Sequence, residues 1–104
     1  MSESKTIETE QPEIKEQPRF KEPPLFEVLL INDDYTTMDF VIEVLEVIFH
    51  KNEIQATTIM LNVHRMGTGV AGVYPRDLAE TKTAMVHDWA RHEGHPLRCA
   101  IKKV

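Results

Sequence analysis

The chain has 104 residues and a formal net charge of −5, with 17 acidic and 12 basic side chains. This length allows one small domain with an appendage, and the acidic balance argues against the basic face that nucleic-acid binding needs. No apolar run reaches the roughly 18 residues of a membrane span, and the first ten residues lack the apolar core of a secretion signal. The single cysteine, Cys99, excludes an internal disulfide and suits a reducing compartment. We therefore expect a cytoplasmic protein that binds neither nucleic acid nor membrane.

The composition changes sharply near Pro24. Residues 1–24 hold four of the six prolines and ten charged residues, but few apolar ones. Such a segment buries too little apolar surface to offset the entropy lost on ordering. We predict a disordered N-terminal extension over residues 1–24 and one folded domain over residues 25–104. Composition leaves open whether the extension only aids solubility or inserts into a partner.

The pattern of residues 25–104 predicts alternating strands and helices. In chain order we expect a strand over 26–31, a helix capped by Thr36 or Thr37, a helix over 53–65 with Asn52 as its candidate cap, a strand over 70–74, a helix from about Pro75 to Arg91, and a strand over 97–104. Gly67 and Gly69 are expected to form a mobile turn after the second helix. This β-α-α-β-α-β order predicts a small α+β domain, a three-stranded sheet with helices packed on one face.

A polar cluster, Asn32, Asp33 and Asp34, follows the first predicted strand directly. One interpretation is structural: an Asx-turn that leads into the next helix. The other is functional, because two adjacent acids and an amide suit a compact cation with three donors, such as a protonated amine. The cluster alone does not decide between these interpretations.

His64 is the second candidate. It shares a helix face with Met60 and Val63 at i, i+3, i+4 spacing. A lone histidine on an apolar stripe is usually a core residue. If the second helix packs beside the end of the first strand, however, His64 faces Asn32 and Asp33, and a neutral imidazole can accept a hydrogen bond from an amine.

Other chemistry is not supported. His87 and His92 lie five residues apart rather than the four of a paired helical metal site, so we predict no metal and no cofactor. The chain has no nucleophile motif, zinc-protease motif or dinucleotide fingerprint, so we expect no enzyme. The charged start of the third helix, with Asp77, Thr81 and Lys82, is either a solvated face or a docking face for a protein partner.

Four stretches of the chain together resemble one known family. VLLINDDYTTMDFVIEVL, TTIMLNVHRMGTGVAGVY, AETKTAMV and HPLRCAIKK are similar to successive segments of ClpS, the bacterial adaptor of the ATP-dependent Clp protease. The similarity covers about residues 24–103. It implies an adaptor that binds proteins with a destabilising N-terminal residue, typically Leu, Phe, Tyr or Trp, and delivers them to a Clp AAA+ unfoldase of the ClpA type.

The resemblance also implies roles for individual residues. Asn32, Asp33 and His64 should bind the α-amino group and first peptide unit of the substrate. The pocket for its first side chain should be lined by Asp34, Thr36, Met38, Val41, Met60, Val63 and Leu97. Docking on the N-terminal domain of the unfoldase should use Asp77, Thr81 and Lys82.

The chain departs from the family pattern at a few positions. Thr37 stands where ClpS commonly has proline, which predicts a less rigid loop, and Arg98 adds a charge beside Leu97. Two other functions remain open. One is a docking domain like the C-terminal domain of the ribosomal stalk protein, which does not require amine chemistry. The other is an aminopeptidase, which the lack of metal ligands and of a nucleophile disfavours. We expect a monomer.

Overall fold

The computed structural model describes residues 22–104, so the predicted extension over residues 1–24 lies almost entirely outside the described residues. The elements are β1 (Leu25–Ile31), α1 (Met38–Val47), α2 (Glu53–Met66), β2 (Thr68–Pro75), α3 (Arg76–Glu93) and β3 (Arg98–Lys103). The predicted β-α-α-β-α-β order is confirmed. No helix within residues 22–104 is long and apolar enough to cross a membrane.

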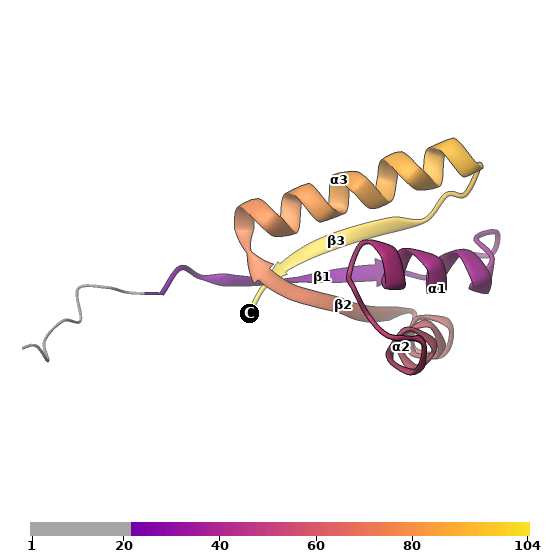
Figure 1. The fold of residues 1–104 in the computed structure, drawn as a ribbon, viewed down its shortest axis with the longest axis horizontal. Helices are drawn as coiled ribbons and strands as arrows, with labels where there is room; N and C mark the ends of the chain where they lie inside the picture. The colour runs from indigo at the N-terminus through magenta and orange to yellow at the C-terminus, as the bar shows by residue number, and fades with distance from the viewer. Residues whose placement is uncertain (1–21) are drawn as a thin grey trace, which may run out of the picture.

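The three strands form one antiparallel sheet in the order β2-β1-β3. Figure 1 shows β1 in the middle, α3 running along the β3 side, and α1 and α2 near the end at which β1 stops. Val28 and Leu30 of β1 are completely buried, because alternate residues of a strand face the same side and this side is covered by the helices. The register of β1 and β2 shifts between Val28 and Leu29, which leaves Ala71 as an extra residue in β2.

Side-chain hydrogen bonds cap the N-termini of α1 and α2. The Thr37 hydroxyl accepts a hydrogen bond from the Phe40 N–H at 3.1 Å, so Thr37 rather than Thr36 caps α1. Asn52 and Gln55 form a reciprocal capping box at the start of α2, with bonds of 2.8 and 3.0 Å. The sequence left the choice between the two threonines open, and the role of Asn52 was predicted.

Two glycines position α2 against the sheet. Gly67 ends α2 in the left-handed region at φ 91°, and its carbonyl accepts the Asn32 N–H at 2.9 Å. Gly69 does not belong to the predicted turn: it lies within β2, paired with Leu30. A Cβ at Gly69 would lie 2.7 Å from a methyl carbon of Val63, so only glycine permits this close contact between β2 and α2. The end of β1 is thereby tied to the last turn of α2.

Candidate functional site

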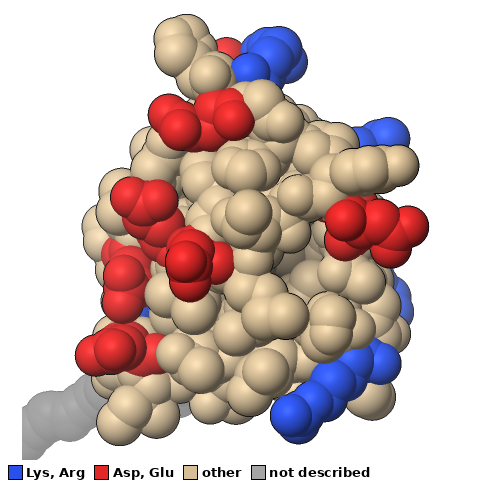
Figure 2. Space-filling model, turned by 90° about the vertical axis from the view of Figure 1, so that its right-hand side faces the viewer, with Lys and Arg blue, Asp and Glu red and all other residues tan. Residues whose placement is uncertain are grey.

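A cavity of about 350 Å³ lies where β1 ends, between the following loop, α1 and α2. Figure 2 looks onto this end of the molecule and shows a hollowed surface of mostly uncharged side chains, with acidic groups toward its margins. The lining residues are Asn32, Asp33, Asp34, Thr36, Thr37, Met38, Val41, Met60, Val63 and His64. Nine of the ten residues expected to bind the N-terminal residue therefore meet around one cavity, although β1 and α2 are separated in the sequence.

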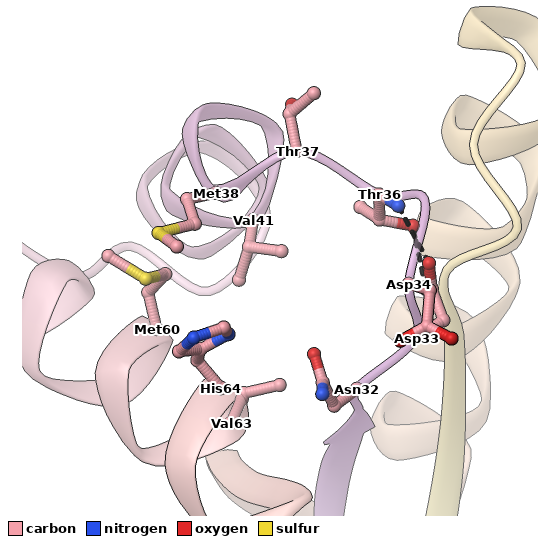
Figure 3. Close-up of a pocket in the computed structure, with 10 residues that line it drawn as sticks. All are labelled: Asn32, Asp33, Asp34, Thr36, Thr37, Met38, Val41, Met60, Val63 and His64. Carbon is pink, nitrogen blue, oxygen red and sulfur yellow. Dashed lines mark hydrogen bonds between the residues drawn. The ribbon is translucent and has the colours of Figure 1, made fainter.

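The polar side of the cavity carries Asn32 and His64. Figure 3 shows the Asn32 side chain and the His64 ring directed toward the same space. Both side chains are exposed, so His64 is not the core residue that its position beside Met60 and Val63 would ordinarily make it. One backbone hydrogen bond brings Asn32 and His64 to the same end of the sheet. The Asn32 N–H donates to the carbonyl of Gly67, which lies only three residues beyond His64.

Asp33 does more than line the cavity, because its carboxylate organises the loop between β1 and α1. One oxygen accepts the N–H groups of Tyr35 and Thr36 at 2.8 and 2.6 Å, and the other accepts the Thr36 hydroxyl at 2.7 Å. The structural and the functional interpretation of the polar cluster are therefore compatible. The Asp33 side chain forms the turn, and the Asn32 side chain takes no part in these hydrogen bonds and lines the cavity. Burial alone raises the pKa of Asp33, but the hydrogen bonds from Thr36 and Tyr35 and the nearby His95 outweigh it, so the pKa lies below its ordinary value.

The other side of the cavity is apolar. Val41, Met60 and Val63 are each less than one-tenth exposed, whereas Met38 is 47% exposed at the rim. Figure 3 shows Met38 of α1 and Met60 of α2 on this side of the cavity. Methionine side chains adapt to ligands of different shape. The cavity thus combines hydrogen-bond acceptors at one side with an adaptable apolar wall at the other.

Leu97, the tenth expected pocket residue, does not line this cavity. Its side chain is 3% exposed and borders a separate hollow between α3 and β3. Thr37, which the sequence reasoning treated only as a helix cap and a departure from the family pattern, does line the cavity. Its place directly before Met38 was the signal that could have identified it.

The three residues expected to dock the unfoldase differ in exposure. Asp77 and Thr81 are exposed on α3, but Lys82 is only 9% exposed. The Lys82 ammonium donates to the Ile48 carbonyl at 2.6 Å and lies 5.3 Å from the centre of the Tyr74 ring. It therefore satisfies a carbonyl at the end of α1, which a helix leaves without an intrahelical partner.

The fold and the cavity are those of a small α+β domain with one cavity that is polar on one side and apolar on the other. The comparisons with known proteins identify its family. The family model described as ATP-dependent Clp protease adaptor protein ClpS matches residues 21–100. The chain belongs to the ClpS family.

Named relatives agree with this assignment. The ClpS adapter of Oleidesulfovibrio alaskensis is 61% identical over 79 residues, which cover 76% of both chains. The ClpS adapter of Alkalilimnicola ehrlichii is 54% identical over 79 residues, 76% of this chain and 74% of its own. The solved structure of Agrobacterium tumefaciens ClpS2 bound to L-phenylalaninamide superposes with a TM-score of 0.77 at 37% identity, covering 80% of this chain and all of the other.

Proposed function

We propose that the cavity binds the first residue of a substrate protein, through its free α-amino group and its side chain together. This proposal rests on one observation: the Asn32 and His64 side chains lie together on one side of a cavity whose other side is apolar. A related ClpS2 is described as bound to L-phenylalaninamide, a molecule with a free amine, an aromatic side chain and an amide. These are the three groups that an N-terminal phenylalanine presents.

In the proposed complex, the Asn32 side-chain oxygen and an unprotonated nitrogen of His64 accept hydrogen bonds from the α-ammonium group. Asp33 contributes its negative charge and the acceptor capacity that remains after its three bonds to the loop. An ammonium group of this kind occurs only at a chain end and on lysine. The backbone of an internal residue offers an uncharged amide with one donor, and the ammonium group of an internal lysine has no second side chain beside it to fill the apolar part of the cavity, so the site rejects both.

The first side chain of the substrate enters the apolar part of the cavity. Burial of a Leu or Phe side chain contributes roughly 1.5–3 kcal/mol, and a hydrogen bond to a charged group roughly 1.5–3 kcal/mol. After the cost of association, these contributions give moderate affinity, which suits an adaptor that must release its cargo. Val and Ile branch at Cβ, so they place extra bulk at the mouth, where Met38 stands. We expect Leu, Phe, Tyr and Trp to bind and Val and Ile to be excluded.

The proposed route of delivery is to a Clp unfoldase of the ClpA type, by docking of α3 on its N-terminal domain. Asp77 and Thr81 are exposed on the first turns of α3, and Leu78 beside them is 43% exposed, which supplies a small mixed surface for a partner. In this proposal Lys82 does not contact the unfoldase. Its hydrogen bond to the Ile48 carbonyl holds α3 against the end of α1 and so positions the docking surface. Binding of Asp77→Lys to the isolated unfoldase domain, compared with wild type, tests this assignment; unchanged affinity would exclude Asp77 from the interface.

The test of N-terminal recognition is fluorescence anisotropy with labelled peptides. A Phe- or Leu-initiated peptide should bind, and peptides that differ only in an acetylated N-terminus, an initial Met or an initial Val should bind far more weakly. Equal affinity for the acetylated peptide would reject amine recognition. It would leave a protein-docking domain like that of the ribosomal stalk, which needs no amine, as the better account of the fold.

A further inference from the structure

A second hollow, of about 290 Å³, lies between the end of α3 and the start of β3. It is lined by His87, Arg91, His95, Pro96, Leu97 and Arg98. Four of these six residues carry a basic side chain, although the chain as a whole has a net charge of −5. A concave site with basic side chains from two elements is the usual setting for a bound anion.

The donors of this hollow are partly fixed by the fold. His87 accepts the Cys99 N–H on its Nε2 at 3.0 Å, so the proton of the neutral ring is on Nδ1, which becomes a donor. Arg91 uses one nitrogen to bind Asp88 at 2.9 Å and keeps further N–H groups. Within residues 22–104, the structure gives Arg98 no ion-pair partner. Arg98 is therefore the cation most available to a ligand.

The charges of these residues act on one another. Burial lowers the pKa of His87, and the nearby Arg98 and Arg91 lower it further, because a second positive charge is costly beside them. His95 is held in place by its ring, which stacks on Phe40 with 4.3 Å between ring centres. The hollow is thus lined by two arginines and two histidines and by no acidic residue.

The hollow adjoins the first cavity across the loop that Asp33 organises. Arg98 pairs with Ile31 in the sheet, directly before Asn32. The charge of His95 helps to lower the pKa of Asp33, which places His95 close to the same loop. Figure 3 shows the segment that leads into β3 passing beside Asp33 and Asp34. An extended peptide chain advances about 3.3 Å per residue.

We propose that this hollow is an anion subsite that binds a carboxylate group, and that it favours substrates with Asp or Glu shortly after their first residue. The second part of this proposal rests on the proposed N-terminal recognition; the binding of an anion does not. The free charge of Arg98 in this hollow complements the acceptor-rich first cavity: the amine of the substrate lies on one side of the Asp33 loop and an acidic side chain on the other. Because Arg98 is exposed, the preference should be modest.

The experiment compares Phe-initiated peptides that carry Glu or Gln at the second, third or fourth position, measured by anisotropy at low salt. At one or more of these positions, the Glu peptide should bind wild type about two- to fivefold more tightly than the Gln peptide, as expected for an exposed ion pair. Arg98→Gln should abolish this ratio without changing the affinity for the Gln peptide. Arg65→Gln is the matched control, because it removes an exposed arginine from α2 that lines neither hollow; it should keep the ratio.

Equal affinities for the Glu and Gln peptides at every position, or a ratio that Arg98→Gln does not change, would overturn the selectivity. A complete lack of binding by Phe-initiated peptides would instead reject the proposed N-terminal recognition. The anion subsite is then decided by NMR titration with acetate and with inorganic phosphate. Saturable shifts at His87 and Arg98 that are lost in Arg98→Gln support an anion site, and phosphate alone causing them would assign it to free phosphate. Shifts that do not saturate would reject the site.

Discussion

The cavity end of the molecule and the α3 face each carry one polar residue whose exposure differs from what its sequence neighbours suggest. His64 on α2 shares a face with two buried residues yet is itself exposed at the cavity. Lys82 on α3 stands in a charged segment yet is 9% exposed. The difference is the partner that the fold provides: Lys82 reaches the Ile48 carbonyl at 2.6 Å, whereas the described residues give the His64 ring no hydrogen bond. Lys82 thus has a structural partner, whereas His64 keeps its hydrogen-bonding capacity for the ligand that we propose.

The largest effect that tests this comparison is expected at Lys82. Lys82→Ala removes the bond to Ile48 and the contacts of the ammonium with the Phe49 and Tyr74 rings. The free energy of unfolding should fall by about 2–3 kcal/mol, because a buried carbonyl loses a charged donor. Urea denaturation of wild type and Lys82→Ala measures this difference in the free energy of unfolding. Thr81→Ala, one residue earlier and exposed, should stay within about 0.5 kcal/mol of wild type. A fully stable Lys82→Ala that no longer binds the unfoldase domain would show that Lys82 is a docking residue after all.

An intermediate effect on both stability and peptide binding is expected at Gly69. The Cβ of Gly69→Ala would press on Val63 and on the Ile59 carbonyl, at 2.7 and 3.2 Å, and would push α2 away from β2. Overpacking of this kind costs roughly 1–3 kcal/mol, and it should also weaken the binding of a Phe-initiated peptide, since α2 carries His64. Thr68→Ala, exposed beside it, is the control for both measurements. Destabilisation with unchanged peptide affinity would show that the position of α2 does not limit the site.

The smallest effect is the pH dependence contributed by Asp33. Burial raises its pKa, but its hydrogen bonds and His95 lower it more, so the folded-state pKa is below the unfolded value of about 3.9. A group with a lowered pKa stabilises the fold above the unfolded pKa, and this stabilisation is lost as the pH falls through the folded pKa. Wild type should therefore lose more stability than Asp33→Asn between about pH 5 and pH 2. Parallel stability curves for the two proteins would contradict the role of the Asp33 carboxylate in the loop.

Local patterns were enough to predict most of the fold. The spacing of apolar residues and the capping residues are properties of short segments, and they gave the order of the six elements and the role of Asn52. They failed where two segments meet. Gly69 looks like a turn residue in the sequence, but its place in β2 follows from the contact with Val63. The extra residue Ala71 in β2 also depends on the pairing with β1 and leaves no local signature.

The candidate site was predictable to a similar extent. The resemblance to ClpS named nine residues that the structure brings around one cavity. The resemblance did not predict that the Asp33 carboxylate accepts three hydrogen bonds from its own loop, nor that Lys82 is buried. Leu97 was placed in the pocket, yet it borders the basic hollow beside it. Burial and bonding partners depend on the packing of distant elements, which a motif does not describe.

The central claim is that Asn32 and His64 bind a free α-amino group, and a thermodynamic cycle tests it most directly. Wild type, Asn32→Ala and His64→Ala are each titrated with a Phe-initiated peptide and with its acetylated form, with Thr58→Ala as an exposed control on α2. Each site variant should weaken binding of the free-amine peptide by about tenfold or more, while all proteins bind the acetylated peptide equally weakly. Equal losses for both peptides, or tight binding of the acetylated peptide by wild type, would contradict the claim.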